Sequence, residues 1–73
     1  MIDTRRRGMR CRAIKLIRIP AGMVTPSSQG TISYEIENLG RQLIHVQWDT
    51  GFSTYVFPDE IDIMAANGST ANL

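Results

Sequence analysis

The chain has 73 residues, a formal net charge of +1 at pH 7 and a hydrophobic content of 42%. A chain this short forms at most one domain, and because it buries only about 60% of its unfolded surface it has little material for a deep substrate cleft. No apolar run reaches the roughly 18 residues that a membrane-spanning helix needs, so we exclude an integral membrane protein.

Cysteine and histidine occur once each, as Cys11 and His45. A single cysteine forms no internal disulfide, which fits a reducing cytoplasm, and these residues offer no conventional metal site. We therefore expect a cytoplasmic protein without a metal or a cofactor. Arg10 and Arg12 flank Cys11 and would favour its reactive thiolate, but inert packing is the commoner role of a lone cysteine in a strand.

Charge is distributed unevenly along the chain. Residues 1–23 contain seven of the eight basic residues and one acid, whereas residues 24–73 contain one basic residue and six acids. Residues 1–9 lack apolar periodicity and include Gly8, so we expect a flexible basic N-terminal arm there. Met9 is an alternative start of the protein, and a start at Met9 would remove three of the arginines.

The segment RCRAIKLIRI, residues 10–19, is rich in β-branched residues with charges between them. Its apolar residues do not follow one alternation, so we predict a strand with a bulge or a change of face near Leu16 and Ile17. A helix is the competing interpretation, because Ala, Lys, Leu and Arg all tolerate one. Pro20 ends either element, and we expect a long turn-rich connection over residues 20–30.

The segment TISYEIEN, residues 31–38, alternates apolar and polar residues. This pattern predicts a strand whose buried face carries Ile32, Tyr34 and Ile36. The residues that follow predict a tight turn, because Asn38 and Gly40 reach positive φ easily.

The next segment, LIHVQW at residues 43–48, places Ile44, Val46 and Trp48 on one face and leaves His45 outward as a surface residue. Residues 52–57 form a further β-rich run with Tyr55 and Phe57 on one face. Proline and two acids at residues 58–60 suit a single helical turn, and residues 61–63 suit a last short strand. Residues 64–73 lack periodicity, and we expect a disordered C-terminal tail.

The tripeptide Asp49-Thr50-Gly51 between these two strands is also the one that carries the catalytic aspartate of aspartic proteases. Those enzymes bring two such loops together so that two carboxylates share a proton, and they have a small residue where this chain has Phe52. A three-residue hairpin loop with glycine in the left-handed conformation fits the same residues without strain. We therefore interpret Asp49 as a turn residue and expect no catalytic residue in a protein that is not an enzyme.

Four short motifs follow one another in a characteristic order: IPAG at 19–22, GTI at 30–32, VQWD at 46–49 and VFPDEIDI at 56–63. In this order they resemble the small bacterial SH3-like barrel proteins of uncharacterised function, over about residues 13–63. The layout is also similar to KOW-type modules and to the ferredoxin-docking subunit S of the NADH-dehydrogenase-like complex. The resemblance implies an all-β, SH3-like, partly open barrel of about five antiparallel strands with one short helical turn, over residues 10–63.

We expect a non-enzymatic binding or assembly module that docks onto a larger protein or complex. In this hypothesis aromatic residues at the barrel rim and neighbouring acids contact a protein partner, while core or rim packing is the alternative role of the aromatic residues. Leu39 and Leu43, if exposed, would add a small contact patch, and open barrel edges favour weak self-association. The candidate protein-binding residues are Tyr34, Trp48, Tyr55, Asp59 and Glu60.

The alternative function is RNA or DNA binding through the N-terminal arm. Exposed guanidinium groups attract phosphates and release counterions, which gives salt-sensitive binding without sequence preference. The acidic remainder of the chain opposes this hypothesis. The candidate nucleic-acid-binding residues are Arg5, Arg6, Arg7, Arg10 and Arg12.

Overall fold

The computed structural model of the protein describes residues 2–20 and 22–64. Strands dominate these residues, and the single helical element is one 3-10 turn, which confirms the all-β prediction. No helix in this part of the chain has the length and apolar character needed to cross a membrane. The elements are β1 (Ile2–Asp3), β2 (Arg10–Ala13), β3 (Ile17–Ile19), β4 (Gly22–Val24), β5 (Gln29–Asn38), β6 (Arg41–Trp48), β7 (Ser53–Val56), η1 (Pro58–Glu60) and β8 (Ile61–Ile63).

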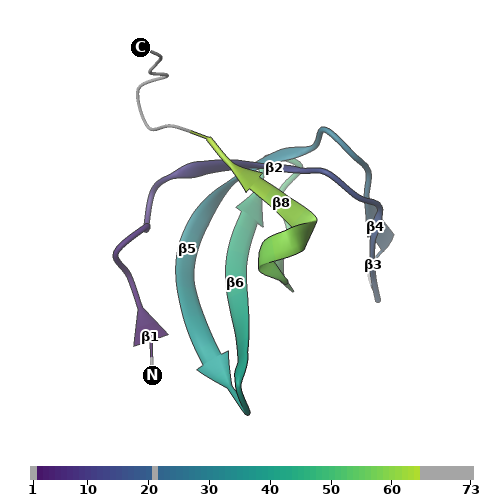
Figure 1. Cartoon of the computed structure of the whole chain (residues 1–73). Helices are drawn as coiled ribbons and strands as arrows, with labels where there is room; N and C mark the ends of the chain where they lie inside the picture. Colours follow the sequence, from purple (N-terminus) through teal and green to yellow (C-terminus); the bar gives the residue numbers. More distant parts are fainter. Residues whose placement is uncertain (1, 21, 65–73) are drawn as a thin grey trace.

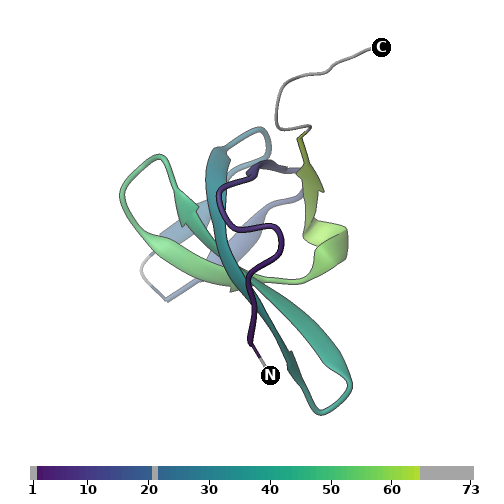
Figure 2. The same ribbon diagram turned by 90° about the vertical axis from the view of Figure 1, so that its left-hand side faces the viewer.

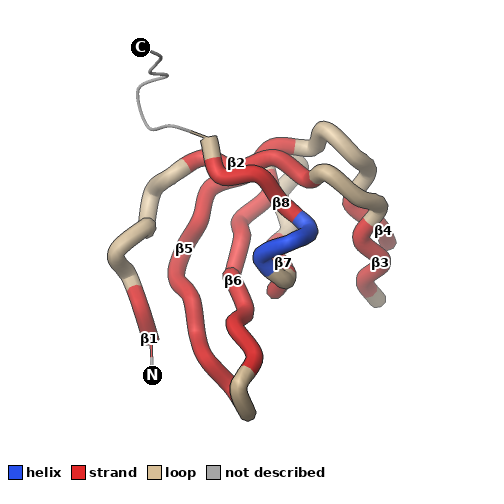
Figure 3. The backbone as a smooth tube through the Cα atoms, viewed as in Figure 1, coloured by secondary structure: helices blue, strands red, loops and turns tan. Residues whose placement is uncertain are grey.

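The main sheet is antiparallel and has β7, β6, β5, β2 and β8 side by side in that order. β1 pairs with β5 next to this path, and β3 and β4 form a separate two-stranded sheet. Figure 1 shows that the long strands β5 and β6 curve, with η1 and β8 on the side toward which they bend. The strands do not close into a barrel, so the fold is open, and the five-strand path agrees with the expected strand number (Figure 3).

The chain changes sheet between β2 and β3, where the broken apolar pattern predicted a change of face. Ile14 and Leu16 are each 45% exposed, whereas Ile17 belongs to the core. The long turn-rich connection predicted for residues 20–30 contains a strand that was not predicted, because Gly22–Val24 forms β4 and pairs with β3. Strands of three residues are too short to show an alternation, so the sequence pattern could not reveal this hairpin.

The C-terminal end of the described chain is Met64, whose backbone N–H donates to the carbonyl oxygen of Arg10 at 2.8 Å. Residues 65–73, which make up most of the predicted tail, lie outside the described residues.

A bulge in β5 between Ile32 and Tyr34 changes which residues point toward the core. Ile32 is buried as predicted, but beyond the bulge Glu35 is buried, and Tyr34 and Ile36 lie on the opposite face. The prediction of one buried face for Ile32, Tyr34 and Ile36 is therefore wrong beyond Ile32. One extra residue in a strand reverses the alternation of its faces, and no local pattern marks this bulge in the sequence.

The hydrophobic core lies between the main sheet and the β3–β4 hairpin. Trp48 is its largest member; it is 1% exposed, and its Nε1 donates a hydrogen bond to Thr54 Oγ1 at 2.9 Å. The positions predicted for the buried face of β6 are confirmed. The buried hydrophobic residues are Cys11, Ala13, Ile17, Val24, Ile32, Ile44, Val46, Trp48, Val56 and Ile61.

Gly30 on β5 lies between Cys11 of β2 and Trp48 of β6. A Cβ atom at this position would lie 2.7 Å from the carbonyl oxygen of Gln47 and 2.7 Å from Cγ1 of Val46. Contacts that short are not tolerated between packed atoms, so the close approach of β5 and β6 requires glycine here for lack of space.

The loop Asp49–Gly51 between β6 and β7 is the predicted hairpin turn. Gly51 has a φ of 112° and donates its N–H to the carbonyl oxygen of Trp48 at 3.0 Å. The Asp49 carboxylate accepts hydrogen bonds from Nη1 and Nη2 of Arg10, at 2.8 and 2.6 Å. The loop is therefore held by a side chain of β2 as well as by its own backbone.

The turn between β5 and β6 consists of Leu39 and Gly40, with φ values of 53° and 79°. Two consecutive positive φ angles are typical of a type I′ hairpin turn. The left-handed position that we had assigned to Asn38 thus belongs to Leu39, which is 95% exposed. Figure 2 shows this hairpin projecting away from the remaining strands.

Replacing Gly30 with alanine should destabilise the fold strongly. The new Cβ must displace the Gln47 carbonyl and the Val46 side chain, and overpacking of this kind costs about 1–3 kcal/mol or more. Urea unfolding followed by Trp48 fluorescence measures the loss. Gln29→Ala at the exposed neighbouring position is the control and should change stability by less than about 0.5 kcal/mol. Equal losses in the two variants would contradict the steric explanation.

Replacing Leu39 with asparagine should stabilise the protein by about 1 kcal/mol, because asparagine tolerates the left-handed conformation better than leucine does. Thermal and urea unfolding measure the gain. Leu39→Ala retains the backbone cost and serves as the matched control, with little expected change. An asparagine variant no more stable than the alanine variant would show that the turn is not strained.

Candidate functional site

Residues 2–9, expected as a flexible arm, lie along β5 in the structure. β1 pairs with the far half of β5, with Ile2 opposite Ile36. Farther along, Gly8 N–H donates to the Ile32 carbonyl at 2.8 Å, and Ile32 N–H donates to the Met9 carbonyl at 2.8 Å. The segment therefore meets β5 on both sides of the bulge.

The five arginines proposed for nucleic-acid binding are engaged with acceptors of the chain itself. Four of them form ion pairs with carboxylates, and the Nε of Arg7 donates to the Ser33 carbonyl at 2.9 Å. The four pairs are Arg5–Asp3 at 2.7 Å, Arg6–Glu35 at 2.7 Å, Arg10–Asp49 at 2.6 Å and Arg12–Asp62 at 3.5 Å. Although basic and acidic residues are largely separated along the sequence, folding places a carboxylate next to each of these four arginines.

The pair between Arg6 and Glu35 is the most buried of these. Glu35 is 3% exposed, and its carboxylate accepts hydrogen bonds from Nε and Nη2 of Arg6 at 2.8 and 2.7 Å and from Nε2 of Gln42 at 2.5 Å. The hydrogen bonds from Arg6 hold the pKa of Glu35 below its ordinary value. A carboxylate this buried requires such partners, so Arg6 makes the inward position of Glu35 tolerable.

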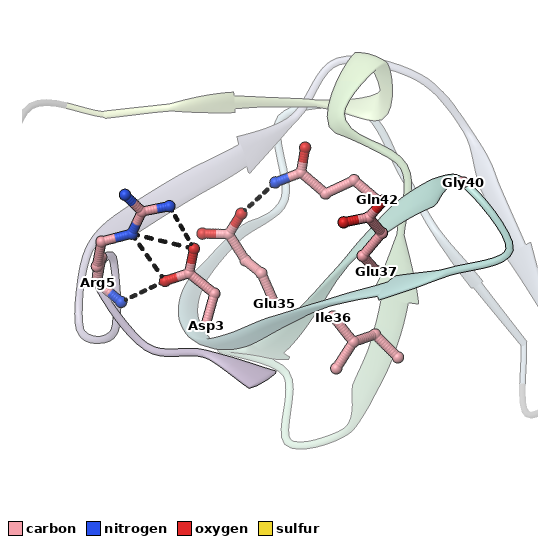
Figure 4. A pocket seen from close by; sticks show the side chains of 7 residues that line it. All are labelled: Asp3, Arg5, Glu35, Ile36, Glu37, Gly40 and Gln42. Carbon is pink, nitrogen blue, oxygen red and sulfur yellow. Dashed lines mark hydrogen bonds and ion pairs between the residues drawn. The ribbon is translucent and has the colours of Figure 1, made fainter. Parts of the chain in front are cut away.

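An open pocket of about 460 Å³ lies beside this pair, at the far end of the β5–β6 hairpin (Figure 4). Asp3 is held there by Arg5, whose side chain and backbone N–H lower the Asp3 pKa to about 2. The described residues contain no group of three or more His, Cys, Asp or Glu side chains placed to hold a metal ion. The pocket is lined by Asp3, Arg5, Glu35, Ile36, Glu37, Gly40 and Gln42.

An aromatic row crosses the opposite face of the sheet on β5, β6 and β7. The Tyr34 and His45 rings stack with centroids 4.8 Å apart, and the His45 and Tyr55 rings meet edge to face at 4.9 Å. The hydroxyl groups of Tyr34 and Tyr55 hydrogen-bond each other. The Nδ1 atom of His45 is buried without a hydrogen-bond partner, and burial lowers the pKa of this imidazole.

Apolar side chains extend the row on the same face. Directly opposed residues of antiparallel strands point to one side of a sheet, so the pairs Tyr34–His45, His45–Tyr55 and Ile36–Leu43 share this face. Ile2 opposes Ile36 and is 67% exposed, and Tyr55 is 46% exposed. We call this surface the aromatic face and define it by Tyr34, Ile36, Leu43, His45 and Tyr55.

The structure brings together only two of the five predicted protein-binding residues, Tyr34 and Tyr55. Trp48 belongs to the core, in line with its alternative role. Asp59 pairs with Lys15 at 3.2 Å, and Glu60 accepts the Phe57 N–H at 2.8 Å. Both acids therefore serve η1 and its surroundings instead of joining the tyrosines.

His45, Ile36 and Leu43 are members of the aromatic face that the candidate list missed. His45 was correctly placed outward, but its stacking on Tyr34 depends on the bulge that turns Tyr34 outward. Alternation in β6 already placed Leu43 and His45 on one side, which was the available signal.

Two further candidates take structural roles. Cys11 is fully buried, and burial raises the pKa of its thiol to about 11, so it stays protonated and inert as the packing interpretation expected. Hydrogen bonds from Arg10 lower the pKa of Asp49, so this carboxylate is ionised at neutral pH.

Lowering the pH from about 7 to about 5 should reduce the stability of the protein through His45. Burial lowers its folded pKa below the ordinary 6.5, so the unfolded chain binds more protons in this window. The contribution of the neutral His45 to the free energy of unfolding is complete above pH 6.5, and it is lost as the pH falls toward the pKa of His45 in the folded chain.

His45→Phe keeps a stacked ring without titration, so its free energy of unfolding should stay level across the same window. Glu35 and Asp49 do not interfere, because their pKa values lie below the ordinary 4.5 and 3.8 and their contributions are lost only at lower pH. Urea unfolding at a series of pH values is the measurement. If the free energy of unfolding of His45→Phe fell with pH as steeply as that of the wild type, His45 would not be the cause of the pH dependence.

Comparison with known proteins adds no relative to this description: no family model matches the chain, and neither does a curated protein or a solved structure.

Proposed function

We propose that the chain is an SH3-like, non-enzymatic docking module that binds another protein through its aromatic face. The observation that carries this proposal is the row of Tyr34, His45 and Tyr55 on a sheet face where Tyr55 remains 46% exposed. The expected order of strands, hairpin turns and 3-10 turn supports the SH3-like assignment.

The chemistry of the row suits protein recognition. Tyrosine combines a large apolar ring with a polar hydroxyl, and such residues are enriched at interfaces and among the residues that dominate binding energy. The side chains of Tyr34 and Tyr55 are fixed by the bond between their hydroxyls and by contact with His45. Fixed side chains lose little conformational entropy when a partner binds.

The apolar neighbours enlarge the surface. Ile36 and Leu43 form the next cross-strand pair on the same face, two residues along from Tyr34 and His45. The exposed Ile2 opposes Ile36 and extends this surface onto β1. Four strands about 4.8 Å apart give a patch of a few hundred Å², the size at which exposed apolar surfaces of soluble domains are often functional. A patch of this size fits a weak or regulated contact with a larger complex.

Charge favours a protein partner over nucleic acid. Arg5, Arg6, Arg10 and Arg12 already have carboxylate partners within 4 Å, so a phosphate would have to compete with them. The aromatic face itself carries no acid or arginine among its five defining residues. Arg41, two residues before Leu43 on the same side of β6, lies over the Phe57 ring, with its guanidinium carbon 5.7 Å from the ring centroid.

Site-specific photo-crosslinking in cells tests the proposal. A benzophenone amino acid at Leu43 samples the aromatic face, and the same probe at Met23 on β4 samples an exposed apolar position of the other sheet, which is 52% exposed. We expect Leu43 to capture one protein species at least about tenfold more efficiently than Met23, with no loss after nuclease treatment.

Tyr34→Ala in the Leu43 probe should reduce this capture about tenfold, because the ring contributes contact area that alanine lacks. Circular dichroism of the variant checks that the sheet is retained. Equal capture at Leu43 and Met23, or capture that nuclease abolishes, would contradict the proposal, and the second result would favour nucleic-acid binding.

A further inference from the structure

β7 is an edge strand of the main sheet, and its outer edge carries backbone groups without hydrogen bonds. Trp48 N–H donates to the Phe52 carbonyl, so the hydrogen-bonded pairs that follow between β6 and β7 are Val46–Thr54 and Ile44–Val56. Bonding alternates along an antiparallel pair, and the N–H and C=O of the intervening Ser53 and Tyr55 therefore point away from β6. Neither residue makes a backbone hydrogen bond to another described segment.

The β7 edge also lacks the charged side chains that usually prevent an edge strand from pairing with another strand. Residues 50–58, TGFSTYVFP, contain no charged side chain. The opposite edge of the main sheet, β8, carries Asp62, which pairs with Arg12. Edge strands of natural proteins are commonly protected by charge or proline, and an uncharged, β-prone edge favours pairing with another strand.

We propose that β7 pairs with β7 of a second copy of this chain, antiparallel and centred on Thr54. In this arrangement Ser53 of each copy lies opposite Tyr55 of the other, so the outward groups of one copy meet those of the other in about four backbone hydrogen bonds. The two main sheets then form one continuous sheet through the two-fold axis.

A second copy fits this edge for two reasons. The outward groups are placed symmetrically on both sides of Thr54, which is what an isologous two-fold interface requires. The edge brings no like charges together, and a net charge of +1 gives little long-range repulsion between copies. With four residues in β7 and Pro58 close behind it, the interface is small, so the dimer is weak and depends on concentration.

The dimer would place two aromatic faces on one sheet surface, because Tyr55 lies on the face of Tyr34 and His45 as well as beside the axis. This pairing is independent of the proposed function: it uses backbone groups of β7, and it stands or falls whether or not the aromatic face binds another protein.

Sedimentation equilibrium of the full chain over a wide range of concentration tests the proposal. The wild type should shift from monomer toward dimer as concentration rises, and Ser53→Lys should weaken this association at least about tenfold by placing a cation at the interface. Asn38→Lys adds the same charge at the exposed end of β5 and should associate like the wild type.

Amide hydrogen exchange of the wild-type chain gives a second reading that needs no variant to fold. Protection of the Ser53 and Tyr55 amides should rise with concentration, while that of Thr54, which already bonds to β6, should change little. A chain that stays monomeric throughout overturns the proposal. So does a dimer in which Ser53→Lys, shown folded by circular dichroism, has no effect, or one without concentration-dependent protection at Ser53 and Tyr55.

Discussion

The contact between Gly30 and Trp48 is the constraint on which the rest of the fold depends. Gly30 pairs with Cys11 on one side and with Trp48 on the other, so three strands of the main sheet meet at a position without a side chain. The absent Cβ allows the indole to lie in the core, and the core in turn receives Ile17 and Val24 from the smaller sheet. A chain this small has few other large side chains with which to fill its interior.

The bulge that follows this contact divides β5 into a half that serves the core and a half that serves the surface. It turns Tyr34 outward onto His45 and brings Glu35 inward, where the cost of burying a carboxylate is offset by Arg6. The bulge therefore has two effects: it creates the aromatic face, and it gives Arg6 of the N-terminal segment its carboxylate partner. A chain starting at Met9 would leave Glu35 without its guanidinium partner.

Local rules were sufficient for much of the fold. Alternation predicted the buried face of β6, and the chemistry of aspartate and glycine predicted the turn at residues 49–51. The bulge and the pairs Arg6–Glu35, Arg10–Asp49 and Arg12–Asp62 depend on contacts between distant segments, which no local pattern contains. The β3–β4 hairpin is local, but its strands of three residues are too short to show an alternation. The candidate site was consequently predicted in part: Tyr34 and Tyr55 were both candidates and His45 was placed outward, but only the bulge puts Tyr34 on the face of His45 and Tyr55.

The burial of Cys11 has a practical consequence. Its thiol lies in a strand bonded on both sides, to β5 and to β8, and burial keeps it protonated. An alkylating reagent can reach the sulfur only after one of these ladders opens, so the rate of modification in excess reagent reports how often the centre of the sheet separates. Because Cys11 is the only cysteine in the sequence, mass spectrometry of the alkylated chain measures this opening rate without any added label.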